Sequence, residues 1–138
     1  MNKIIILSLV VAAAYYLYED DISLEGTWTD NGEKTLQSMV SVGKIEENRV
    51  TRAMEASFSD ATYIFTKDTV GMSFKSDPLF NNDPIPYEVI DKGKSSITIT
   101  YDVKPGKTET QTYYFTDDKQ CIYIKPGSYN IYMCRDQA

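Results

Sequence analysis

The residue types that most often perform catalysis are scarce in this sequence. There is no histidine, which removes the usual base of a nucleophilic triad and the commonest metal ligand. A glycoside hydrolase would instead need two carboxylates in one cleft, and the candidates by type are Glu46, Glu47, Glu55, Glu88 and Glu109. Their spacing marks no two of them as converging. We predict no enzyme, with no catalytic residue, no metal ligand and no cofactor; a carboxylate-dependent hydrolase is the last alternative.

The irregular stretch from Ser76 to Pro86 is a second place to look for chemistry. Its Asp and Asn residues offer oxygen ligands but lack the spacing of a calcium loop, and they are typical of the turns that precede proline. Leu79 and Phe80 stand at the tip. If exposed, they would gate the mouth of a barrel or contact a partner; if buried, they would hold the loop in place. We favour the buried arrangement and keep both residues as candidate partner contacts.

The two cysteines, Cys121 and Cys134, predict a disulfide. The segments around them read as a hairpin, and a type II′ turn at Gly127-Ser128 would place the cysteines directly opposite one another. That pair would be of the non-hydrogen-bonded kind, in which Cα atoms come within disulfide reach. With Pro126-Gly127 as the turn, Cys121 would face Tyr132 and the bridge would be diagonal or absent. Two free thiols acting as metal ligands or nucleophiles are the other alternative.

The same hairpin carries tyrosines that are candidate partner contacts. In the predicted register Tyr123 and Tyr132 lie opposite one another on the outer face, while isoleucine and methionine side chains face the core. Cross-strand aromatic pairing is a sufficient structural reason for them. Tyrosine is also the residue most used on recognition surfaces, so binding is the functional alternative.

The N-terminus predicts export. Lys3 precedes an uncharged apolar run, Ile4 to Ala14, and acids follow at 19–21. We assign residues 1–21 to a signal peptide or an N-terminal membrane anchor, and residues 22–138 to the folded domain. An A-x-A pattern allows cleavage after Ala14, and an uncleaved anchor would run from Ile4 to Tyr18. Either form places the domain in the periplasm, soluble or attached to the inner membrane.

The net charge limits the kinds of partner, and the chain length limits the number of domains. The net charge of −6 argues against nucleic acid. With 138 residues, 42% of them hydrophobic, the chain is long enough for a single domain with its own core.

The hydrophobic pattern predicts a mainly β domain. A strand at 24–29 is followed by two helical segments, 33–42 and 45–58, after which the period changes to two. Eight short strands joined by tight turns favour a closed, antiparallel up-and-down barrel with one or two short helices inserted after the first strand. Closure leaves no exposed edge, so we expect a monomer. An open sheet with both helices on one face is the alternative. The seven later strands are expected at 61–67, 69–75, 85–91, 95–103, 109–117, 120–124 and 129–135.

Three motif residues, Gly26, Trp28 and Arg135, give the pattern a resemblance to lipocalins and the wider calycin group. There a G-x-W opens the barrel, and the resemblance implies that a late arginine packs across the tryptophan ring at the closed end. The segments GTWTDNGEKTL and CIYIKPGSYNIYMCR look like small exported lipocalin-like bacterial proteins of unknown function. Helices after the first strand and a short chain depart from ordinary lipocalins and argue against a large ligand cavity.

We therefore predict a non-enzymatic exported barrel that binds a small apolar molecule in its lumen or an envelope protein on its outer face. The alternative is an inhibitor or immunity-type protein whose loop plugs the cleft of a cell-envelope enzyme, and the acidic balance suits a basic target. An apolar lumen above about 300 Å³ would favour a small molecule. A filled interior with Leu79 and Phe80 protruding would favour a protein.

Overall fold

The computed structural model of this chain describes residues 22–46, 48, 57–80 and 83–135. The predicted leader, with its cleavage site after Ala14, lies outside the described residues, and so does most of the predicted helix 45–58. Within the part that is described, no helix is long and apolar enough to span a membrane.

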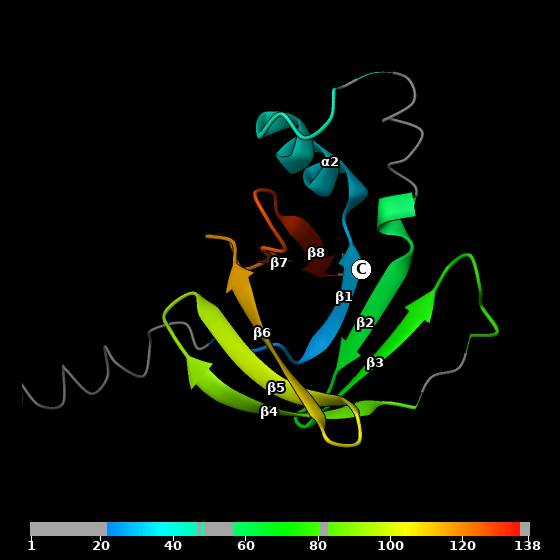
Figure 1. The fold of residues 1–138 in the computed structure, drawn as a ribbon, viewed down its shortest axis with the longest axis vertical. Helices are drawn as coiled ribbons and strands as arrows, with labels where there is room; N and C mark the ends of the chain where they lie inside the picture. The colour runs from blue at the N-terminus through cyan, green and yellow to red at the C-terminus, as the bar shows by residue number, and fades with distance from the viewer. Residues whose placement is uncertain (1–21, 47, 49–56, 81–82, 136–138) are drawn as a thin grey trace, which may run out of the picture.

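Eight antiparallel strands close into an up-and-down barrel in chain order, as the sequence predicted (Figure 1). The alternative of an open sheet is wrong, because β1 pairs with both β2 and β8. Strands form where apolar and polar residues alternate, since alternation gives each strand one face for the core and one for solvent. The strands are β1 (Gly26–Asp30), β2 (Ala61–Phe65), β3 (Thr69–Phe74), β4 (Ile85–Lys92), β5 (Ser96–Lys104), β6 (Lys107–Phe115), β7 (Cys121–Ile124) and β8 (Ile131–Arg135).

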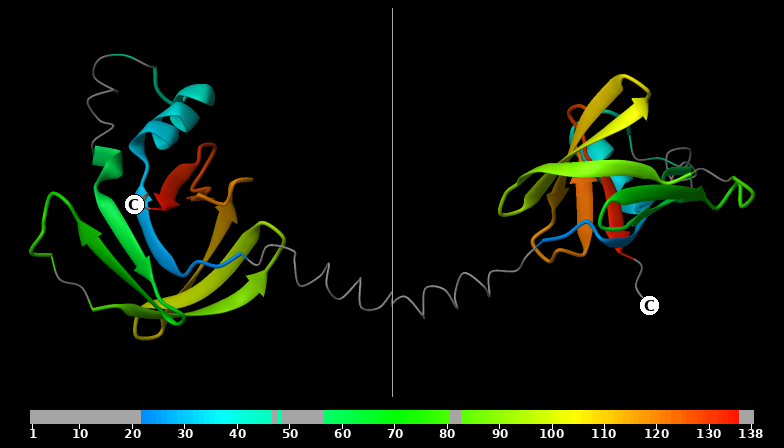
Figure 2. Two further views of the ribbon diagram at one scale, coloured as in Figure 1. Left: turned by 180° about the vertical axis from the view of Figure 1, so that it is seen from behind. Right: turned by 90° about the horizontal axis from the view of Figure 1, so that it is seen from below.

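Two ladders that help to close the barrel are short. Strands β3 and β4 pair at two positions, and so do β6 and β7, whereas β5 and β6 pair along most of their length. Strands β4, β5 and β6 therefore form a three-stranded arm that runs past its neighbours. In the right-hand view of Figure 2 the end of the β5–β6 hairpin, in yellow, stands clear of the other strands. The short ladders are Thr69–Pro86 with Val70–Ile85, and Tyr114–Tyr123 with Phe115–Ile122.

Aromatic side chains fill the interior. Trp28 is completely buried and meets Phe115 edge to face, with ring centres 6.1 Å apart. Phe65 makes the same kind of contact with Tyr87 and with Tyr113, each at 5.7 Å. Edge-to-face contacts of this kind add to the free energy gained by burial. The lumen is thus a packed core of rings.

A short strap, residues 22–25, covers the end of the barrel at which β1 begins. Ile22 and Leu24 are buried and belong to the core cluster. The indole Nε1 of Trp28 donates a hydrogen bond of 2.7 Å to the carbonyl of Leu24. The strap therefore gives the buried tryptophan nitrogen its acceptor, and this end of the barrel is closed.

At the other end, helix α2 (Gly32–Ser41) follows β1, where a helix was predicted. The side chain of Asn31 caps it by accepting from the amide of Lys34. Gly43, predicted to end the helix, follows it with a φ of 73°. In the described residues α2 is the single α-helix, and the 3-10 turn η1 (Ser57–Ser59) precedes β2.

Two hydroxyl groups of helix α2 accept hydrogen bonds from the backbone at the start of β8. Thr35 is 1% exposed, and its Oγ1 accepts from the amide of Tyr132 at 3.0 Å. The amide of Asn130 donates to Ser38 Oγ at 2.8 Å. The helix thereby satisfies backbone donors at the start of β8.

The C-terminal hairpin has the predicted register without the predicted turn. Cys121 pairs with Cys134 and Ile124 with Ile131. The prediction of a type II′ turn was wrong: that turn needs a positive φ at Gly127, which Gly127 does not have. Residues 125–130 form a wider bend, because the contact of this loop with α2 decides its path.

Candidate functional site

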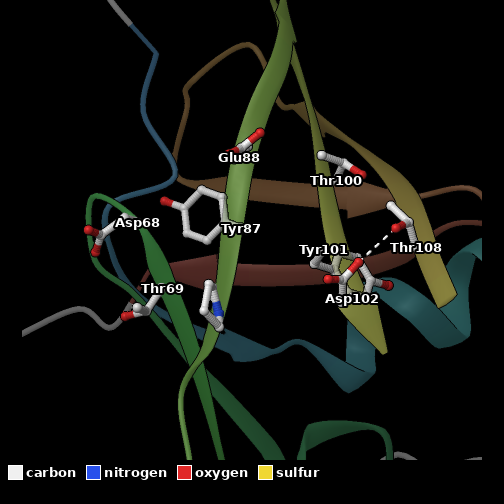
Figure 3. A pocket seen from close by; sticks show the side chains of 9 residues that line it. Asp68, Thr69, Tyr87, Glu88, Thr100, Tyr101, Asp102 and Thr108 are labelled. Atoms are coloured by element: carbon white, nitrogen blue, oxygen red, sulfur yellow. Dashed lines mark hydrogen bonds between the residues drawn. The ribbon is translucent and has the colours of Figure 1, made fainter. Parts of the chain in front are cut away.

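A hollow of about 610 Å³ opens beside the β2–β3 turn and over the arm (Figure 3). The residues that line it are Asp68, Thr69, Pro86, Tyr87, Glu88, Thr100, Tyr101, Asp102 and Thr108.

Strand register places four of the residues that line the hollow on the outer face of the arm. Glu88 pairs with Thr100, and Asp102 pairs with Thr108, so these side chains share one face. Tyr87 is the neighbour of Glu88 along β4 and belongs to the core cluster, so its side chain points the other way. Tyr87 pairs with Tyr101, and both also line the hollow, so the lining combines residues from the two faces of the arm.

The lining offers oxygen atoms. Three carboxylates, those of Asp68, Glu88 and Asp102, come from the β2–β3 turn, β4 and β5, and the lining contains no lysine or arginine. Thr108 Oγ1 donates to Asp102 Oδ1 at 2.7 Å, which orients that carboxylate (Figure 3). Carboxylates without a cation among the lining residues complement a ligand that brings positive charge.

Two of the glutamates considered for a carboxylate-dependent hydrolase, Glu88 and Glu109, lie on opposite faces of the arm. In the described part of the chain no group of three or more Asp, Glu or Cys residues is arranged to hold a metal ion. Glu88 lines the hollow, whereas Glu109 pairs with Tyr101 on the opposite face of the arm. Glu47 and Glu55 lie outside the described residues.

The prediction that Leu79 and Phe80 are buried is wrong, since Leu79 is 90% exposed and Phe80 is 38% exposed. Phe80 packs edge to face on Phe74 of β3, with ring centres 5.0 Å apart, and so holds the loop. The contact between Phe80 and Phe74 therefore holds the loop in place, while the neighbouring Leu79 remains exposed to solvent.

Tyr123 and Tyr132 pair as predicted and are part of a longer strip. Tyr114 of β6 stacks on Tyr123 at 5.4 Å, and Tyr123 lies 5.1 Å from Tyr132. The ammonium of Lys125 lies 4.3 Å from the centre of the Tyr114 ring. Sequence reasoning missed Tyr114, because the register between β6 and β7 was not predictable from a turn. These contacts between rings and with Lys125 stabilise the strip, and a role of Tyr123 and Tyr132 in partner contact stays a prediction.

The three motif residues meet at the closed end. The guanidinium of Arg135 lies 4.2 Å from the centre of the Trp28 ring. Gly26 has a φ of 129°, and a Cβ at this position would lie 2.8 Å from Arg135 Nη1. Glycine therefore allows the arginine to reach the ring.

The predicted disulfide is present. Cys121 and Cys134 are bonded, with their Cα atoms 4.0 Å apart, and the described residues contain no free cysteine. The bridge lies on the same face as Tyr123 and Tyr132, by alternation along β7 and β8.

One buried acid was not singled out from the sequence. Asp30 pairs with Met133, so its side chain lies on the core face, and its Oδ1 is buried without a hydrogen-bond partner among the described residues. Burial raises the pKa of Asp30 to about 6, with hydrogen bonds to Ala61 and Tyr63 opposing the shift and the nearby charge of Asp60 adding to it. Burial and the charge of Asp30 also raise the pKa of Tyr63 to about 12. The sequence did not indicate that Asp30 is buried, because Asp30 is the last residue of its strand and strand ends are usually exposed.

No family model, curated protein or solved structure matches this chain. Its function is inferred from the geometry of its own residues.

Proposed function

We propose that this chain is an exported, non-enzymatic binding domain that holds a cationic segment of an envelope protein in the acidic hollow at the arm. The proposal rests on the position of the hollow and on the residues that line it. The hollow is lined by the carboxylates of Asp68, Glu88 and Asp102, while aromatic rings fill the interior of the barrel. A ligand that enters the lumen would have to displace those rings, whereas the hollow is already open.

The compartment belongs to the same proposal. The charged and apolar order of residues 1–21 favours export to the periplasm, with the leader cleaved or kept as an anchor. The Cys121–Cys134 bridge is compatible with an oxidising compartment. We also propose a distant relation to lipocalin-like proteins, supported by the contact between Arg135 and Trp28.

Peptide titration tests the hollow directly. The exported, disulfide-bonded protein is titrated with a fluorescent oligolysine peptide and, separately, with an oligoglutamate peptide of the same length. We expect oligolysine to bind. The double variant Glu88→Gln with Asp102→Asn should weaken binding about tenfold or more, because both changes remove charge from the lining. The control is Glu33→Gln with Asp117→Asn, which removes the same two charges at exposed acids that do not line the hollow.

The outcomes separate the hollow from the rest of the surface. Loss of affinity in the double variant of the hollow, with near wild-type affinity in the control variant, supports the proposal. An equal loss of affinity in both variants would show that only the overall negative charge attracts the peptide, and unchanged affinity in both would show that the peptide binds elsewhere. Binding of a fluorescent fatty acid, with none of oligolysine, would move the site to the lumen.

An inhibitor-type protein is the second candidate, because Leu79 is 90% exposed beside a residue packed on β3. Such a leucine is suited to enter an apolar pocket of a target enzyme. Leu79→Asp should abolish inhibition of a susceptible envelope enzyme while leaving oligolysine binding unchanged. If Leu79→Asp inhibits as well as the wild type does, the loop is not the inhibitory element.

A further inference from the structure

Strand β6 has an unpaired edge although the barrel is closed. On one side β6 pairs with β5 from Tyr114 to Lys107. On the other side it pairs with β7 only at Tyr114 and Phe115. We call Lys107 to Tyr113 the β6 edge; residues 107–110 of it are exposed.

Hydrogen bonds at the end of β6 show which backbone groups the edge presents. The amide of Phe115 donates to the carbonyl of Ser95, on the β5 side. The amide of Thr116 donates to the carbonyl of Cys121, on the β7 side. In an antiparallel ladder these directions alternate from residue to residue. The N–H and C=O groups of even-numbered residues, Thr108, Thr110 and Thr112, therefore point away from β5.

Part of this edge is already occupied. Gln111 Nε2 donates to the carbonyl of Thr112 at 2.8 Å. Both groups of Thr110 and of Thr108, and the amide of Thr112, have no backbone partner in the part of the chain that is described. Unpaired groups of this kind are a template for another strand.

The side chains limit the partner and its register. If two copies of β6 paired antiparallel about Glu109, two carboxylates would lie directly opposite one another, which is destabilising. Pairing about Gln111 would require Tyr114, whose backbone already pairs with Tyr123. Pairing about Thr108 would run into the turn at Gly106, where φ is 82°.

Pairing about Thr110 avoids all three problems. Thr110 then lies opposite Thr110 of the second copy, Thr108 opposite Thr112, and Glu109 opposite Gln111. No like charges face one another, and each unpaired threonine backbone meets a partner once Gln111 releases the Thr112 carbonyl. We propose that the β6 edge binds a second copy of this chain in that register, which joins two arms into one continuous sheet about a two-fold axis.

This dimer goes beyond the binding function proposed above and shares one residue with it. The side chain of Thr108 lines the hollow, whereas its backbone belongs to the β6 edge. The dimer uses backbone groups and the hollow uses side chains, so association and oligolysine binding are measured separately and either can fail without the other.

Thr110→Pro tests the dimer with little effect on the monomer. Its amide points away from β5, so proline removes a donor that the described ladder does not use, as edge strands permit. Sedimentation velocity over a concentration series should show the wild type, and the control Thr110→Val, reaching twice the mass of one chain. Thr110→Pro should weaken association about tenfold or more.

Hydrogen exchange gives a second measurement on the unaltered protein. Protection of the Thr108, Thr110 and Thr112 amides should rise with protein concentration, since these donors gain acceptors in the dimer. Wild-type protein that keeps the mass of one chain at every concentration would overturn the proposal. So would a Thr110→Pro dimer of wild-type affinity, or protection of these amides that does not depend on concentration; the exchange result decides if Thr110→Pro does not fold.

Discussion

The guanidinium of Arg135 lies 4.2 Å from the centre of the Trp28 ring and also donates to the strap, to the carbonyl of Glu25 at 3.2 Å and to that of Ser23 at 3.3 Å. A residue of the last strand is thereby attached both to the first strand and to the segment that precedes it. The planar guanidinium suits this role, because it stacks on the ring with its face and donates from its edge.

Arg135→Lys should lower the free energy of unfolding by about 1 to 2 kcal/mol, even though the charge is kept. Lysine is a point charge and cannot stack and donate to Glu25 and Ser23 at the same time. Urea unfolding monitored by the fluorescence of Trp28 measures the change. Lys125→Ala, which removes a cation from the Tyr114 ring, is the comparison. Equal stability of Arg135→Lys and wild type would mean that charge alone is needed at the closed end.

Gly26→Ala should destabilise the barrel by about 1 to 3 kcal/mol. The new Cβ would lie 2.8 Å from Arg135 Nη1, at a backbone φ of 129° that other residues avoid. Gly127→Ala is the matched control, since its Cβ would meet nothing within 4 Å and its φ is not positive. Thermal unfolding should separate the two variants; equal midpoints would contradict the steric account.

Replacing both cysteines, Cys121→Ser with Cys134→Ser, should cost about 3 kcal/mol under oxidising conditions. The bridge spans a sequence separation of 13, and a short closed loop of this kind restricts the unfolded chain by about that much. The comparison is urea unfolding with and without a reductant. With the reductant, wild type and the variant should unfold alike; a difference that persists would show that the serines disturb packing.

Protonation of Asp30 should stabilise the fold. The pKa of this carboxyl rises from 3.8 to about 6 on folding, chiefly through burial. Its favourable contribution is therefore complete below about pH 4 and is lost as the pH rises through about 6. A shift of this size corresponds to about 3 kcal/mol for a shielded group, and partial exposure reduces it to roughly 1 to 2 kcal/mol.

The variant Asp30→Asn measures the contribution of this one carboxyl to the pH dependence of stability. The variant should be more stable than wild type at about pH 7.5, and the two should differ little at about pH 4. Thermal unfolding at both values measures this. Asp117→Asn, exposed between β6 and β7, controls for the loss of one charge. A stabilisation of Asp30→Asn that is equal at both pH values would assign the effect to packing.

Local patterns predicted much of this fold. Alternation of apolar and polar residues located every strand to within a few positions, and the hairpin register that pairs Cys121 with Cys134 followed from counting between two segments. Helix α2 was predictable because its apolar spacing and Gly43 are local signals. The turn at Gly127 was not, since Asn130 is held by Ser38, which is 92 positions away in the chain.

Composition and periodicity thus determined that this chain is an acidic β barrel with a disulfide and no histidine chemistry, because those properties depend on residue type and near neighbours. The tertiary structure alone decided where the barrel is concave, which acid is buried and which edge is unpaired. The lengths of the ladders between strands bring Asp68 and Asp102 into one hollow. They also leave Thr110 without a paired strand on one side. Those lengths depend on how the arm twists against the rest of the barrel, which no local pattern encodes.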